Sequence, residues 1–332
     1  MKKIIKYLKK AFCSLDSRTN LSYGLLAHYL AKVAKSQTYI ETFSKHADTL
    51  HKWIKNIYEE DIKRAFEIQA RNTIKSLNIR SAELAFDITH EPFYGKARNL
   101  HIINVDKKTH SYGANFLYVT CCLINKGKQI PLMALPVRYG EQVKLTIDLI
   151  KYCLSLKFKI KFALFDRGFY VSELIDFLNS QNIKYLMLVP ALKGILQGYR
   201  DKTKKFAKYF HKMKYQKEKS SWKPIVQIVV CKDIFEFDWM FATNIQINNS
   251  LDYVLLYKRR WQIETNYRVE DEARIKSKSS NYLIRYFYFM ISNLFHLLWI
   301  VHKNVSNYIQ FKRYLDIIET KLFYDFLWIE GV

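Results

Sequence analysis

The sequence predicts an α/β protein in which a mixed sheet is flanked by helices and preceded by an all-helical N-terminal region. Between residues 20 and 78, apolar residues recur at spacings of three and four, which is the period of a helix. After Arg80, strand-like apolar runs alternate with helical segments, and this alternation indicates layers of sheet and helix. Hydrophobic residues form 49% of the 332-residue chain, so the composition supports a folded core.

The N-terminal region contains an amphipathic segment, KHADTLHKWIKNI, at residues 45–57. A helix-turn-helix recognition helix has this pattern, and so does an ordinary surface helix, so both interpretations fit the sequence. We expect Leu50, Trp53, Ile54 and Ile57 to face inward, and His51, Lys52 and Lys55 to face outward.

The strands and helices of the second region follow one another in a regular order. The run SAELAFDIT is expected to form a strand that ends at Asp87, and residues 111–137 form two long strands joined by a hairpin turn at residues 125–128. Further elements are expected in this order: a helix (about 141–156), a strand (159–166), a helix (171–180), a strand (183–190) and two more strands (224–233 and 235–244).

The chain is strongly basic. It has 54 Lys plus Arg against 30 Asp plus Glu, a formal net charge of +24. Such an excess favours binding to nucleic acid, although membranes and acidic proteins can also use it. The five cysteines include no C-x-x-C spacing, so we expect a reducing compartment and no structural zinc.

A lysine-rich tract covers residues 194–223 and carries aromatic residues between its cations. One interpretation is a solvated loop, and the other, which the overall charge favours, is a DNA-facing insertion. In the second interpretation Lys204, Lys205 and Lys208 are candidate DNA contacts.

The apolar segment 282–301 approaches the length of a membrane span. It contains Arg285, Ser292, Asn293 and His296, which place polar atoms at several depths. A helix in the core of a large soluble domain tolerates these residues better than lipid does, so we expect no membrane partner.

Two acidic residues follow apolar runs at the expected ends of strands. Asp87 and Asp166 are poor strand formers, and the carboxyl ends of strands are where open α/β sheets bind ligands. Glu264, a single early acid within the basic stretch YKRRWQIETNYRVE, could join them from a nearby helix. Three such carboxylates suit Mg²⁺ or Mn²⁺, with a pair of ions serving phosphoryl transfer. Alternatively, the two Asp residues cap strands or turns, and Glu264 pairs with a neighbouring arginine.

The basic stretch also resembles a known signature. Tyr257, Arg260 and Glu264 have the spacing Y-x2-R-x3-E, which is similar to the signature of the Tyr-Arg-Glu-Lys group of DDE transposases from bacterial and archaeal insertion sequences. AFDITHEPFYGK resembles the first-Asp block of that family, and LFDRGFYVSELI resembles its second-Asp block. LMLVPALKG and FATN are similar to two intermediate landmarks, so the resemblance covers roughly residues 80–300.

The resemblance implies an RNase H-like catalytic domain with a β-rich basic insertion. It makes Asp87, Asp166 and Glu264 the catalytic ligands of Mg²⁺ or Mn²⁺, two ions in all. The expected division is a helical DNA-binding region (1–79), a catalytic domain (80–193 and 245–310), an insertion (194–244) and a helical tail (311–332). Together with the three lysines of the insertion, the expected DNA contacts are Tyr257, Lys258, Arg259, Arg260 and Arg268.

The chain departs from the signature at one position. The family has Lys seven residues after the Glu, whereas this sequence has Asp271. Arg268 follows Glu264 by one helical turn and is the residue that we expect to replace the missing phosphate contact, ahead of Arg274 and Lys276.

The sequence thus predicts a transposase that binds the two ends of its element as a homodimer, cleaves double-stranded DNA and joins the released 3′-hydroxyl to target DNA. A nuclease of the same architecture that does not join, or a catalytically silent DNA-binding repressor, are the alternatives. We expect the protein in the cytoplasm of a prokaryote, on the chromosome.

Overall fold

The computed structural model describes residues 23–43, 47–96, 99–104, 113–125, 127–190, 194–213, 224–261, 271–303 and 310–330. Two of the expected site residues, Glu264 and Arg268, lie outside these ranges.

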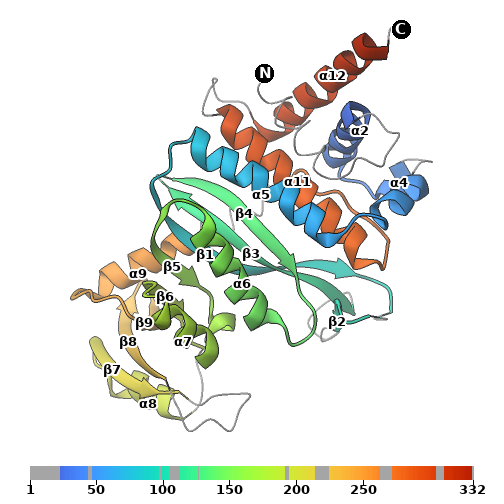
Figure 1. Ribbon diagram of the computed structural model, residues 1–332. Helices are drawn as coiled ribbons and strands as arrows, with labels where there is room; N and C mark the ends of the chain where they lie inside the picture. Colours follow the sequence, from blue (N-terminus) through green and yellow to red (C-terminus); the bar gives the residue numbers. More distant parts are fainter. Residues whose placement is uncertain are drawn as a thin grey trace.

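A mixed sheet of nine strands, counted over the described residues, forms the centre of the molecule (Figure 1). The strands are β1 (Ser81–Phe93), β2 (Ile102–Asn104), β3 (Ala114–Asn125), β4 (Lys128–Pro136), β5 (Lys159–Phe165), β6 (Tyr185–Leu188), β7 (Phe206–Lys212), β8 (Ile225–Ile234) and β9 (Phe237–Thr243). Their order is β2-β3-β1-β5-β6-β9-β8-β7, with β4 also paired to β3. β1, β5 and β6 are parallel, and the remaining pairings are antiparallel.

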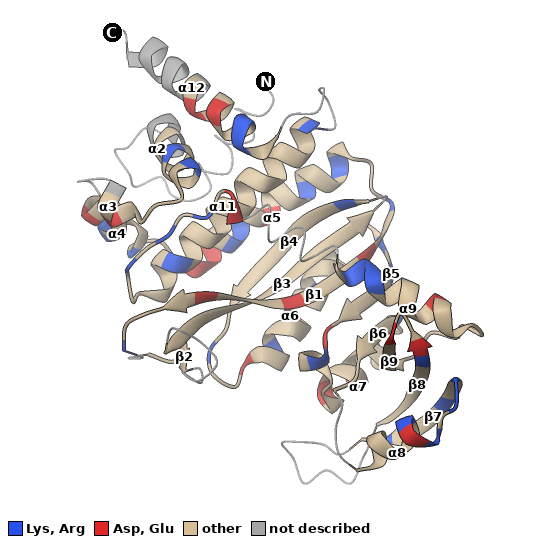
Figure 2. Ribbon diagram, turned by 180° about the vertical axis from the view of Figure 1, so that it is seen from behind, with Lys and Arg blue, Asp and Glu red and all other residues tan. Residues whose placement is uncertain are grey.

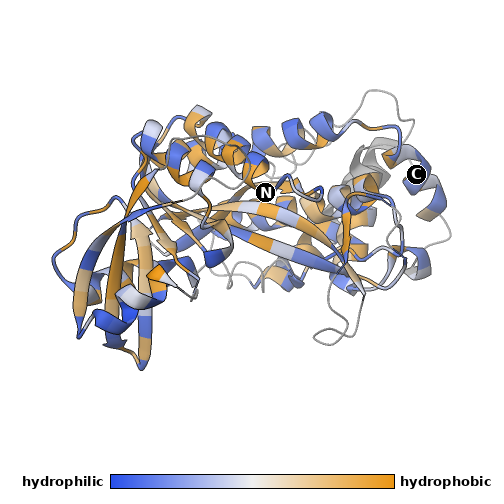
Figure 3. Ribbon diagram, turned by 90° about the horizontal axis from the view of Figure 1, so that it is seen from below, coloured by the Kyte–Doolittle hydropathy of each residue, from blue (hydrophilic) through white to orange (hydrophobic). Residues whose placement is uncertain are grey.

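Helices flank this sheet, which confirms the α/β prediction. They are α2 (Tyr23–Ser36), α3 (Ile40–Phe43), α4 (Ala47–Ile54), α5 (Glu59–Ser76), α6 (Gln142–Ser155), α7 (Ser172–Ser180), α8 (Ile195–Lys202), α9 (Ser250–Lys258), α11 (Tyr282–Lys303) and α12 (Phe311–Glu330). Two 3₁₀ turns, η1 (Arg167–Phe169) and η2 (Arg259–Trp261), follow β5 and α9. Figure 3 shows hydrophobic residues along the central strands and mixed hydropathy on the surrounding helices.

Alternation along β1 assigns its side chains to two different apolar clusters. Phe86 stacks on Phe165 in the cluster that includes α6 and α7. Ala85 belongs to the cluster formed with α9. Because side chains alternate along a strand, Glu83, Asp87 and Glu91 share the face of Ala85.

The expectation that the first strand ends at Asp87 is wrong. β1 continues to Phe93, because β3 is long enough to pair with it from Glu83↔Ile124 through Phe93↔Ala114. Only the pairing with β5 stops at Phe86↔Phe165. Asp87 therefore lies in the middle of β1, at the point where its parallel neighbour ends.

The N-terminal helices pack onto the rest of the chain. The prediction that His51 faces outward is wrong, because α4 lies against α11 and the His51 ring, only 9% exposed, is 5.9 Å from that of Tyr288. Leu50 and Ile54 are buried as expected. Helix α2 lies beside α12, where Lys35 bonds acidic side chains, so segments from opposite ends of the chain meet (Figure 1).

The residues of the expected insertion, 194–244, extend the central sheet. After the unexpected helix α8 they form β7, β8 and β9, and β9 pairs with β6 through Leu186↔Thr243. β7 thus stands at the far end of the same sheet that carries Asp87.

Helix α11 is long and apolar enough to cross a membrane by length and composition, but 94% of its 18-residue apolar window is buried within the protein. Its polar side chains have partners inside. Arg285 Nη1 lies 2.6 Å from Glu91 Oε1 of β1, and Ser292 Oγ donates to the carbonyl oxygen of Ala273 at 2.8 Å. Tyr118 also donates to Glu91 Oε2 at 3.2 Å. Burial raises the pKa of Glu91, while the Arg285 charge opposes that rise.

Because Arg285 and Glu91 are both buried, removing one charge leaves the other without compensation. We expect Arg285→Met to lower the free energy of unfolding by about 3–5 kcal/mol. The double variant Glu91→Gln/Arg285→Met keeps an acceptor for Tyr118 and should lose less than Arg285→Met alone. Urea denaturation measures both changes, and a double variant that is less stable than the single one would contradict this account of the pair.

Candidate active site

The register between β1 and β5 brings Asp87 and Asp166 together. Phe86 and Phe165 are partners in this parallel pair, and their rings stack with centroids 4.8 Å apart. Asp87 and Asp166 are the next residue on each chain. Since neighbouring strands lie about 4.8 Å apart, the two acids stand side by side where β5 ends.

Both carboxylates lie on the side of the sheet that α9 covers. Ala85 and Leu164, each two residues earlier, pack in one apolar cluster with α9. The helix begins at Ser250, where the Asn249 side chain accepts a hydrogen bond from the Leu251 amide at 2.9 Å. Its buried face then leads to Tyr257, and η2 follows directly.

Tyr257 and Arg260 connect the two carboxylates. Tyr257 OH donates to Asp166 Oδ1 at 3.4 Å and accepts from Arg260 Nε at 3.1 Å. Arg260 Nη1 donates to Asp87 Oδ2 at 3.2 Å. The two residues assigned to DNA contact therefore bind the acids directly in this structure.

Burial changes the pKa values of Tyr257 and Arg260. Tyr257 is 1% exposed and Arg260 is 6% exposed. Burial raises the pKa of Tyr257, so the hydroxyl keeps its proton and remains a donor. Burial alone would lower the pKa of Arg260, but the Tyr257 oxygen and the two carboxylates outweigh it and raise that pKa, so the guanidinium stays charged.

The alternative that the two acids only cap turns does not fit Asp166. Its backbone carbonyl accepts from Phe169 in η1, but its side chain makes no capping bond there. Asp87 Oδ1 does accept from the Ile88 amide at 2.8 Å, while Oδ2 binds Arg260. Each carboxylate therefore has at least one oxygen that bonds a side chain from α9 or η2 instead of the neighbouring backbone.

Glu83 is a further acidic residue beside this site that we did not expect. Its Oε1 lies 2.5 Å from Arg259 Nη1, so the consecutive arginines of η2 bind two acids on one face of β1. The sequence did contain a signal for Glu83. Side chains alternate along a strand, so Glu83 and Asp87, which are four residues apart, lie on the same face.

The other expected DNA contacts within the described residues lie at the end of α9 and around β7. Lys258 Nζ lies over the Phe235 ring at 3.5 Å. Lys204 and Lys205 are exposed before β7, and Lys208 is on β7. That strand is five positions from β1 in the sheet, but Lys208 reaches back to α9, where its Nζ lies 6.0 Å from the centre of the Tyr253 ring. Figure 2 shows basic residues at the end of α9 and on β7 at separate places.

Asp271, where the signature has Lys, pairs with Arg274 at 3.1 Å. Arg274, one of the residues considered as a replacement for the missing lysine, is therefore already paired with an acid. Arg268, the expected replacement, lies outside the described residues.

The donor set at Asp87 and Asp166 fits a divalent cation. Two adjacent carboxylates supply the hard oxygen atoms that Mg²⁺ and Mn²⁺ prefer. Within the described ranges no group of three or more His, Cys, Asp and Glu residues is suited to hold a metal. The structure therefore describes two of the three acids of the expected site, and the third, Glu264, lies outside the described residues.

Residues 127–298 match the family model described as "Transposase DDE domain". This match covers more than half of the chain, and the chain belongs to that family of transposases. Asp166 and Glu264 lie within the matched residues, whereas Asp87 precedes them and is placed by the strand register.

Among solved structures, the chain is similar to a piggyBac transposase, determined by cryo-EM as a synaptic complex with hairpin DNA. The TM-score is 0.60 at 12% sequence identity, with 96% of this chain and 77% of that chain covered, which shows a shared fold. No match was found among curated proteins.

The neighbouring arginines of η2 provide a matched test of the site. We expect Arg260→Lys to lower the free energy of unfolding by about 1–3 kcal/mol, because one ammonium cannot replace a fork that bonds Tyr257 and Asp87 together. Arg259→Lys should cost less than about 1 kcal/mol, since the Arg259 side chain is 51% exposed. Thermal and urea unfolding measure both, and equal losses would contradict the described contacts.

Proposed function

We propose that this protein is an insertion-sequence transposase that cleaves DNA at the ends of its element and transfers the released 3′-hydroxyl to target DNA. The observation that carries the proposal is the side-by-side position of Asp87 and Asp166, held by Tyr257 and Arg260. Membership of the transposase DDE domain family supports the same reaction class.

In this proposal Asp87, Asp166 and Glu264 hold two divalent cations, Mg²⁺ or Mn²⁺. When bound, such a pair activates the attacking oxygen and stabilises the leaving oxygen of a phosphoryl transfer. Glu264 enters by its place in the signature, four residues after Arg260.

The surrounding residues position these carboxylates. Tyr257 donates to Asp166 and so fixes the direction of one oxygen, while Arg260 holds one oxygen of Asp87. The Arg260 guanidinium compensates the charge of the adjacent acids in the absence of cations, and Tyr257 contributes a hydrogen bond. Water and then the 3′-hydroxyl are the nucleophiles, so no protein side chain has to form a covalent intermediate.

We propose that DNA is the partner of this protein, because its phosphates would neutralise the net charge of +24. Lys258, Arg259 and Arg268 are proposed to hold the backbone near the carboxylates. The lysines beside and on β7 are proposed to contact the duplex alongside α9, because Lys208 Nζ lies 6.0 Å from the centre of the Tyr253 ring, one helical turn before Tyr257.

The larger assembly follows from the reaction. We propose an RNase H-like catalytic domain (80–193 and 245–310), an N-terminal DNA-binding region (1–79), a basic insertion (194–244), and a tail (311–332). Pairing of two element ends calls for a homodimer, which acts on the chromosome in the cytoplasm of a prokaryote.

Labelled duplex DNA carrying the element's flanking ends tests the reaction. We expect nicked and joined products only with Mg²⁺ or Mn²⁺, and a loss of more than about a hundredfold in Asp166→Asn and in Glu264→Gln because each removes a metal-binding charge. Asp252→Asn, an exposed acid on α9, is the matched control and should retain activity.

The products separate the candidate functions. Cleavage without joining favours a nuclease, and DNA binding without metal-dependent products favours a repressor. Cleavage that persists in both site variants would overturn the three-acid assignment.

A further inference from the structure

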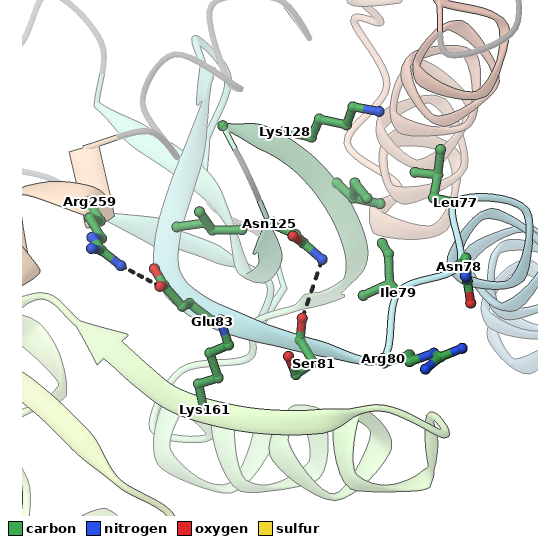
Figure 4. A pocket seen from close by; sticks show the side chains of 13 residues that line it. Leu77, Asn78, Ile79, Arg80, Ser81, Glu83, Asn125, Lys128, Lys161 and Arg259 are labelled. Atoms are coloured by element: carbon green, nitrogen blue, oxygen red, sulfur yellow. Dashed lines mark hydrogen bonds and ion pairs between the residues drawn. The ribbon is translucent and has the colours of Figure 1, made fainter.

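A cavity of about 600 Å³ opens beside the start of β1, away from the carboxylate pair. Its walls come from the segment after α5, the β3–β4 turn, β5 and η2 (Figure 4). The charged residues that line it are Arg80, Glu83, Lys128, Lys161 and Arg259. Four cations against one carboxylate give this cavity a formal charge of +3, which suits an anion.

Glu83 positions the Arg259 guanidinium at the edge of the cavity. Glu83 is 8% exposed, and its Oε1 binds Arg259 Nη1 at 2.5 Å. A guanidinium has five N–H donors in a rigid fork, and the Arg259 side chain is 51% exposed, so donors remain for a ligand. Such a fork matches the oxygen atoms of a phosphate.

Lysine and arginine side chains from other elements complete the basic lining. Glu83 Oε2 is buried with no hydrogen-bond partner among the described residues, and Lys161 extends from β5 toward Glu83 (Figure 4). Neither Arg80 nor Lys161 makes an ion pair with any described residue. Their charge is therefore available to an incoming anion.

The cavity is aligned with the active site. Glu83 and Asp87 are four residues apart on one face of β1, or about 13 Å at roughly 3.3 Å per residue. Arg259 and Arg260 are consecutive in η2 and bind these two acids respectively. DNA carries one phosphate per about 3.4 Å of helix axis on each strand, so 13 Å corresponds to a few nucleotides.

We propose that this cavity is a second phosphate-binding site, which holds the DNA backbone a few nucleotides from the phosphate that reacts at Asp87 and Asp166. The inference rests on the proposed function, because it takes the reacting DNA to lie at those two acids. Arg80, Lys161 and Arg259 bind the phosphate, and Glu83 is a positioning residue that orients Arg259. The chain-wide charge of +24 and the alignment along β1 favour a nucleic-acid backbone over a free phosphate.

The dependence of DNA affinity on salt tests the site. Each phosphate contact contributes about 0.9 to the slope of log K against log salt concentration. The full-length Arg80→Ala/Lys161→Ala variant should therefore reduce the slope by roughly 0.9, the contribution of one phosphate. The control Lys144→Ala/Lys151→Ala removes two exposed lysines of α6, outside the cavity lining, and should leave the slope unchanged.

Neutral methylphosphonate linkages, placed one at a time along the element end, locate the contact. In the native protein a neutral linkage a few nucleotides from the cleavage site should weaken binding about as much as the double variant does, and in the variant the same linkage should have no further effect. Pyrophosphate that binds the native protein at millimolar concentration but not the double variant, and that leaves DNA affinity unchanged, would assign the cavity to a small phosphate and overturn the proposal.

The failures can be told apart. If the native protein cleaves with metal but the cavity variant keeps the native salt slope, the second site is wrong and the proposed function stands. If the native protein neither binds nor cleaves the DNA, the proposed function itself fails.

Discussion

Three carboxylates on one face of β1, each paired with an arginine from the C-terminal half of the chain, hold the site together. Glu83 pairs with Arg259, Asp87 with Arg260, and Glu91 with Arg285 of α11. Buried acids are costly unless they are paired, so β1 can carry them only with α9, η2 and α11 in place. The position of Asp87 beside Asp166 therefore depends on the same contacts that pack the helices on this face.

The three pairs differ in exposure, and their roles differ accordingly. The Glu91–Arg285 pair is closed off by aromatic rings, with the guanidinium over Phe116 at 4.8 Å, and serves packing. The Asp87–Arg260 pair is part-buried next to Asp166, at the proposed reaction site. The Glu83–Arg259 pair opens onto a cavity and leaves donors for a ligand. The exposure of the arginine side chain therefore rises along β1, from 4% in Arg285 to 7% in Arg260 and 51% in Arg259.

Local sequence patterns predicted most of the elements, since hydrophobic periodicity, hairpin residues and the residues after apolar runs are all local signals. Asp166 was placed correctly after its strand because Phe165 is the last residue that β5 pairs. Asp87 was placed wrongly at a strand end, since the length of β1 depends on pairing with β3. His51 was assigned to solvent because its own helix is amphipathic, whereas α11, more than 200 residues later, covers it. Glu83 and Glu91 were missed because their partners are 176 and 194 residues away.

These separations also bear on how the molecule is made. During synthesis, Glu83, Asp87 and Glu91 leave the ribosome well before residues 259–285, and α2 emerges before the α12 residues against which it packs. The contacts that neutralise the acids are nonlocal and form late, since loop closure over such lengths is slow. A nascent chain therefore carries these acids without their partners until residues 259–285 have been synthesised, and a product terminated before them would contain the acids without the arginines that allow them to be buried.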